Sequence, residues 1–153
     1  MNCFGICECN GKCLKTGILA GIAIFAIMMI ASLAAQAIFA YDAVSLAGMR
    51  AINDPIMILF FVYPFVLAFA MTCVYCKIEG ILKGDWMAKG KQFGLLVWIV
   101  AGIPSAFLVW SSMNYPIGFI VNSLIGSLLY MVAGGLVIAW SNKAPKTKAK
   151  KKR

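Results

Sequence analysis

Four long apolar runs, separated by polar stretches, dominate the pattern of the chain. They cover residues 17–40, 55–76, 92–112 and 116–140, and none of them contains Asp, Glu, Lys or Arg. Each run is close to the roughly 20 residues with which an α-helix crosses about 30 Å of hydrocarbon. The runs are far longer than the roughly 10-residue alternating strands of a membrane barrel, so the pattern predicts four transmembrane helices.

The composition indicates lipid rather than water as the solvent of these helices. Hydrophobic residues make up 63% of the 153 residues and charged residues only 12%, whereas a soluble domain carries about 25% charged residues. Helices satisfy their backbone hydrogen bonds internally, which hydrocarbon requires of any spanning segment. We therefore expect an all-α membrane protein whose four transmembrane helices form an antiparallel bundle.

The distribution of basic residues predicts the orientation of the bundle. Lys12 and Lys15 precede the first run, four lysines lie between residues 77 and 91, and a strongly basic segment follows the fourth run. All three groups fall on one side of a four-span topology, and basic loops stay in the cytoplasm. We expect a multi-pass protein of the cell membrane with both termini cytoplasmic.

This pattern divides the chain into three parts. Residues 1–16 form a cysteine-rich cytoplasmic segment, 17–140 the transmembrane domain, and 141–153 a basic tail. The tail has no acidic or aromatic residue, so we expect it to be disordered. Lys146–Arg153 should attract anionic lipids, and its charge carries no specificity for a nucleic-acid sequence.

Two absences narrow the chemistry. The chain contains no histidine, which excludes bis-histidine haem, imidazole-containing zinc sites and histidine-based catalytic triads. Proton-coupled transport usually needs an acidic or basic residue inside a span, and the four runs have none. These absences favour a non-enzymatic protein, and the sequence identifies no catalytic residue.

The opening stretch "MNCFGICECNGKC" holds four cysteines, Cys3, Cys7, Cys9 and Cys13. Cytosolic thiols stay reduced, so metal binding or redox exchange is a better functional interpretation than structural disulfides. Four thiolates could hold a tetrahedral zinc ion, and this is the metal site that we expect. An iron–sulfur cluster is an alternative without the familiar ligand spacing, and acylation is another if the protein is eukaryotic.

A second cysteine motif, "CVYC", ends the second run with Cys73 and Cys76. The spacing of three residues places both sulfurs on one helix face, which makes them a candidate redox pair. A working C-x-x-C normally begins a helix, where the dipole favours the thiolate, whereas this pair ends one. The favoured interpretation is therefore two small apolar side chains in a membrane helix.

The segment Lys77 to Trp140 resembles small uncharacterised prokaryotic four-helix integral membrane proteins. The resemblance rests on a basic loop leading into "WMAKGKQFGLLVWIVAGIPS", a turn with proline and a glycine-rich last span. It implies a four-helix membrane fold, and it brings no catalytic residue with it. The amino-terminal cysteines lie outside it.

Three functional hypotheses remain. The first is a non-enzymatic scaffold or subunit of a membrane complex, with a membrane protein or a second copy of the chain as partner. Gly17 and Gly21 form a GxxxG motif that suits a dimer face, although packing within one monomer is favoured. The second is a cytoplasmic-face thiol protein that binds zinc or an iron–sulfur cluster or exchanges thiols. The third is a transporter of small solutes.

Overall fold

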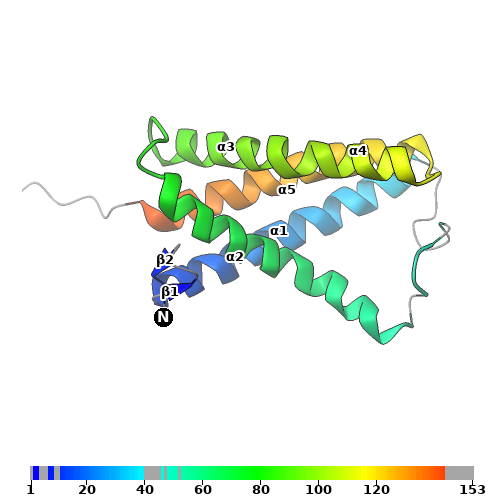
Figure 1. The fold of residues 1–153 in the computed structure, drawn as a ribbon, viewed down its shortest axis with the longest axis horizontal. Coiled ribbons are helices and arrows are strands. Elements are labelled where there is room, and N and C mark those ends of the chain that lie inside the picture. Colours follow the sequence, from blue (N-terminus) through cyan, green and yellow to red (C-terminus); the bar gives the residue numbers. More distant parts are fainter. Residues whose placement is uncertain are drawn as a thin grey trace, which may run out of the picture.

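The computed structural model describes the chain mainly as helices (Figure 1). Two strands of two residues each, β1 (Asn2–Cys3) and β2 (Cys7–Glu8), precede the helices. The α-helices are α1 (Gly11–Ile38), α2 (Ile58–Ile78), α3 (Trp86–Val97), α4 (Ile103–Ser112) and α5 (Ile117–Asn142). A short 3-10 helix, η1 (Pro55–Met57), precedes α2, and a π-helical segment, η2 (Trp98–Gly102), joins α3 to α4. The residues described are 2–3, 7–8, 11–39, 46, 48–51 and 53–143.

The prediction of an all-α membrane protein with four spanning helices is confirmed. Within the described residues, four helical segments are long and apolar enough to cross a membrane: Gly11–Ile38, Pro55–Ile78, Trp86–Ser112 and Ile117–Asn142. Large apolar side chains on their outer faces stay exposed, for example Ile58 at 66%, Val100 at 69% and Phe107 at 62%. Lipid tails suit such a surface, whereas water would make it an aggregation site.

Helix α5 lies at the centre of the arrangement, packed against both α1 and α3. Helix α2 packs chiefly on α1, and Figure 1 shows its beginning diverging from the other helices. The beginnings of α1 and α3 and the ends of α2 and α5 lie at one end of the molecule (Figure 1). We call this the basic end, because Lys12, Lys77, Lys89 and Lys143 lie on these helix ends.

Two helices begin earlier than the apolar runs predict. Helix α1 begins at Gly11 rather than Gly17, so the boundary predicted after residue 16 falls inside it. Lysine and leucine are good helix formers, and nothing between Lys12 and Thr16 stops the helix. Helix α3 begins at Trp86 rather than Gln92, because the Asp85 side chain accepts a hydrogen bond from the Ala88 N–H at 3.0 Å and caps it.

The third span contains a π-helical segment just before Pro104. In η2, the Ile103 N–H reaches the Trp98 carbonyl five residues earlier. The wider turn accommodates a proline, whose nitrogen carries no hydrogen to donate within the helix. The span therefore continues through Pro104 into α4.

Glycines set the closest helix contacts, and all of these contacts lie within the chain. Atoms added as Cβ at Gly17 and Gly21 would stand 2.5 Å from the rings of Phe69 and Phe65 on α2. On the other side of the molecule, a Cβ at Gly94 would stand 2.5 Å from the backbone of Val132 on α5. Small residues let membrane helices approach closely. The GxxxG motif of α1 thus packs on α2.

The main buried cluster lies between α1, α2, α3 and α5. Tyr75 and Phe93 form its aromatic centre, with ring centroids 5.2 Å apart and the rings close to perpendicular at 71°. Edge-to-face geometry is favourable for aromatic pairs. The buried members are Ala20, Ile24, Ala68, Met71, Tyr75, Phe93, Ile138 and Ala139.

Candidate functional site

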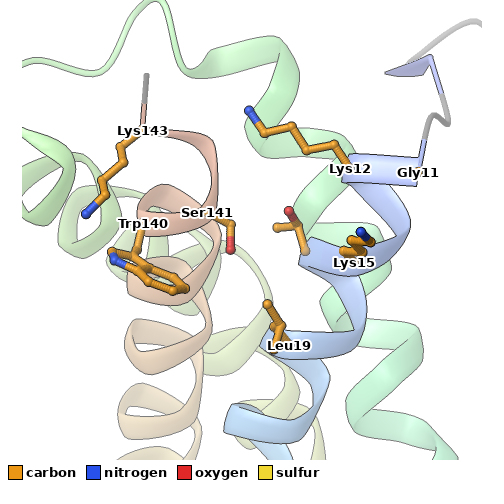
Figure 2. Close-up of a pocket in the computed structure, with 8 residues that line it drawn as sticks. Gly11, Lys12, Lys15, Leu19, Trp140, Ser141 and Lys143 are labelled. Atoms are coloured by element: carbon orange, nitrogen blue, oxygen red, sulfur yellow. The ribbon is translucent and has the colours of Figure 1, made fainter. Parts of the chain in front are cut away.

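A large pocket lies at the basic end, between the first turns of α1 and the last turn of α5 (Figure 2). Its volume is about 710 Å³. We call it the lysine pocket, because three of its lining residues are lysines. The lining residues are Gly11, Lys12, Lys15, Thr16, Leu19, Trp140, Ser141 and Lys143.

The side chains of the lysine pocket combine exposed positive charge with a buried polar atom. Lys12, Lys15 and Lys143 are exposed, and Figure 2 shows Lys12 reaching from α1 toward the end of α5. The Ser141 Oγ is buried and has no hydrogen-bond partner among the described residues. A buried hydroxyl without a partner is costly, so a ligand that bonds to it would gain affinity.

Two tryptophan rings lie beside Lys143, and one of them, Trp140, also lines the lysine pocket. The Lys143 Nζ lies 5.5 Å from the centroid of the Trp86 ring and 5.5 Å from that of Trp140. An ammonium group within about 6 Å of an aromatic face is attracted by the ring quadrupole. Because Trp86 begins α3 and Trp140 lies in the last turn of α5, Lys143 joins the ends of two spans.

The opposite end of the molecule carries little net charge in the described residues. There Arg50 donates a hydrogen bond to the Asp54 carboxylate at 2.8 Å. The Ile56 N–H also donates to Asp54, at 2.9 Å, and thereby caps η1. These two hydrogen bonds, the backbone one first, hold the pKa of Asp54 below its ordinary value.

A second, smaller cavity lies inside the helices and gathers polar residues that are scattered in the sequence. Its volume is about 160 Å³, enough for several water molecules. One lining residue, Ser127, accepts a hydrogen bond from the Trp98 Nε1 at 3.1 Å, and the same Nε1 donates to the Leu124 carbonyl at 3.0 Å. Its polar lining residues are Ser32, Asn122, Ser123, Ser127 and Tyr130, from α1 and α5.

The structure locates the predicted zinc ligands only in part. Cys3 and Cys7 lie opposite each other in the β1–β2 pair, and Cys13 is buried in the first turn of α1. Cys9 lies outside the described residues. Within the described residues, no group of three or more His, Cys, Asp or Glu side chains is placed to hold a metal ion. The four-thiolate zinc site stays a prediction.

The second cysteine motif and the tail have different outcomes. Cys73 is half-buried and Cys76 is exposed, one turn before the end of α2. The two side chains therefore differ in their surroundings, and their role as a redox pair stays a prediction. Lys146–Arg153 lies outside the described residues, so its attraction to anionic lipids also stays a prediction.

Sequence reasoning identified the basic residues but not the pocket that they form. Lys12 and Lys15 were interpreted as a topology signal and as neighbours of the amino-terminal thiols, and Lys143 and Trp86 received no common role. The pocket forms only because α1 begins at Gly11 and so carries both lysines beside the end of α5. Helix-forming residues ahead of the apolar run were the available signal.

Comparison with protein-family models, with curated proteins and with solved structures finds no match. The class of the protein rests on the fold itself. Four apolar helices of spanning length, a lipid-suited outer surface and six cysteines define a cysteine-rich, multi-pass α-helical membrane protein.

Proposed function

We propose that the four spans form an antiparallel bundle in the cell membrane, with the basic end and both termini in the cytoplasm. The asymmetry of charge supports this orientation. In the described residues, the basic end carries seven lysines against Glu8, Glu79 and Asp85, whereas the opposite end carries the paired Arg50 and Asp54. Loops and tails rich in lysine remain on the cytoplasmic side.

Impermeant thiol labelling tests the orientation. In a variant with all six native cysteines replaced by serine, N114C is expected to react with a membrane-impermeant maleimide applied to intact cells. K83C, the matched position in the loop between α2 and α3, should react only after permeabilisation. Labelling of K83C but not N114C in intact cells would reverse the topology.

We propose further that the protein is a non-enzymatic membrane scaffold that holds an anionic phospholipid at the lysine pocket. The observation that supports this function is the convergence of Lys12, Lys15 and Lys143 on one pocket of about 710 Å³ at the end of two spans. The pocket lies at the depth expected for headgroups, since Trp86 and Trp140 at the span ends prefer that level.

The chemistry of the lining favours a phosphate group over a neutral ligand. Lysine binds phosphate as a point charge, and a serine hydroxyl can donate a hydrogen bond to a phosphate oxygen. Leu19 and the Trp140 ring supply apolar surface beside the lysines, which suits the glycerol and upper acyl region of a lipid. A soluble phosphate compound would leave this apolar surface uncovered.

Lipid binding to the purified protein tests the proposal. Each lysine near anionic lipid contributes about 1 kcal/mol, so a K12Q/K15Q/K143Q variant should lose up to about 3 kcal/mol, or about 100-fold in affinity. Native mass spectrometry in neutral detergent should show phosphatidylglycerol retained by the wild-type chain and lost from the variant. Phosphatidylcholine should bind weakly to both.

A charge-matched control separates the pocket from diffuse attraction. K77Q/K83Q/K91Q removes the same charge from the same end, at residues that do not line the lysine pocket. This control is expected to keep the bound phosphatidylglycerol. If both triple variants lose lipid equally, the basic end attracts anions without a defined site, and the proposal fails.

A transporter of small solutes is the second candidate that a specific observation favours. The second cavity, of about 160 Å³, brings Ser32, Asn122 and Ser127 together between α1 and α5. Its lining in the described residues includes no charged side chain, so any solute would be neutral or cross with its charge unpaired. The lysine pocket therefore remains the better supported site.

A further inference from the structure

The contacts between α1 and α2 follow a constant register. The Phe25 and Phe61 rings lie 6.1 Å apart between centroids. Four residues earlier on α1, Gly21 faces Phe65, and four residues earlier again, Gly17 faces Phe69. Each step of four residues back along α1 is therefore matched by a step of four residues forward along α2.

Extending this register by one further step pairs two cysteines. It moves from Gly17 to Cys13 on α1 and from Phe69 to Cys73 on α2. Both positions lie inside their helices, which extend to Gly11 and to Ile78. Residues four apart lie on one helix face, so we expect the register to extend to these positions. Cys13 is 6% exposed, as expected of a side chain enclosed between two helices.

We propose that Cys13 and Cys73 form a two-thiolate site between α1 and α2 that binds Cu(I). This site differs from both cysteine groups that the sequence suggests, because it takes one cysteine from each. It is also independent of the proposed lipid binding, since neither cysteine lines the lysine pocket.

The number and kind of ligands favour Cu(I) over zinc. Structural zinc takes four ligands in tetrahedral geometry, whereas no group of three or more metal-ligating side chains is assembled within the described residues. Soft thiolates select Cu(I), which is stable with two sulfur ligands in a linear arrangement. The proposed site takes one thiolate from each helix, which is the number of ligands that this geometry needs.

The binding step is balanced without a further reactant. Two Cu–S bonds form, two S–H bonds break, and both protons pass to solvent. The copper ion stays Cu(I), so no oxidant or reductant is consumed. The complex carries one negative charge, which the positive amino-terminal end of α1 and the neighbouring Lys12 and Lys77 offset.

Copper titration tests the site in a chain that keeps only these two cysteines. The C3S/C7S/C9S/C76S variant, purified under anaerobic reducing conditions, should bind one Cu(I) per chain in competition with a chromogenic Cu(I) chelator. Adding C13S or C73S should abolish this binding, while circular dichroism should show the same helix content. If the parent variant binds no Cu(I), or if either serine variant keeps it, the two-thiolate site is wrong.

Disulfide formation tests the proximity of the two sulfurs separately. The oxidant diamide should join Cys13 to Cys73 in the same parent variant: each thiol gives up one hydrogen, and the N=N bond of diamide is reduced to a hydrazine. The matched control, C73S/V74C, also keeps two thiols but places one at an exposed position, where Val74 is 45% exposed. Peptide mass spectrometry should find the disulfide in the parent variant only. Equal disulfide formation in the control, or none in the parent, would contradict the register.

Discussion

Substituting Gly94 with valine is expected to separate α3 from α5 and to give the largest loss of stability of any single glycine change. A Cβ at this position would stand 2.5 Å from the Val132 Cα and 2.7 Å from the Met131 carbonyl oxygen. Backbone atoms of a helix cannot rotate away as a side chain can, so the helices must move apart. Overpacking typically costs about 1–3 kcal/mol, and G94V should reach the upper part of that range.

The unfolding of G94V can be followed by circular dichroism during titration with SDS in mixed micelles. The midpoint should fall to a lower SDS fraction than that of the wild-type chain. G80V is the matched control, because a Cβ at Gly80 meets no atom within 4 Å. Its midpoint should stay close to the wild-type value. A G94V midpoint equal to that of G80V would mean that α3 and α5 are not in close contact.

The number, class and approximate limits of the spans followed from the sequence because the membrane imposes a simple rule. A spanning helix must be apolar for about 20 residues. The predicted runs 55–76 and 116–140 therefore end within two residues of the observed helical segments Pro55–Ile78 and Ile117–Asn142. The rule says nothing about where a helix ends in the headgroup region. The rule therefore did not predict the first turns of α1 and α3. Lysines continue α1 toward its beginning, and a capping aspartate sets the beginning of α3.

The pattern of apolar residues does not predict which helices pack against each other. The Gly17 and Gly21 motif indicated a close contact, but either a second chain or another span could supply the partner, and α2 supplies it. Gly90 and Gly94 carry the same spacing, but Gly90 fell in the predicted basic loop and Gly94 in the third apolar run. Such a choice depends on the shape of both partners, which the spacing of one helix cannot define.

The candidate sites show the same division between local and long-range information. Lys12, Lys15 and Lys143 belong to the basic segments from which the topology was predicted. Their common pocket forms only where α1 and α5 lie side by side. Ser32 and Asn122 were isolated polar residues in the sequence, and they now line one cavity. Each site joins residues far apart in the chain, so only the packing of the helices could bring them together.

Substituting Phe93 with alanine is expected to destabilise the packed helices. This change leaves the glycine contacts between α3 and α5 in place. Phe93 is 0% exposed, and its ring meets the Tyr75 ring with centroids 5.2 Å apart. In soluble cores, Phe→Ala costs about 3–5 kcal/mol. Part of that cost is transfer to water, which is absent here because separated helices keep Phe93 in lipid. The remaining cost is lost packing and an unfilled cavity, so about 3 kcal/mol or less is expected.

A lipid-facing phenylalanine supplies the control for this prediction. Phe107 is 62% exposed on α4, so F107A should change the stability by no more than about 0.5 kcal/mol. The SDS midpoint of F93A should therefore fall well below that of F107A, with F93A retaining the wild-type helix content before the transition. Equal midpoints for the two variants would place Phe93 in contact with lipid, and the cluster between α1, α2, α3 and α5 would not be the stabilising core.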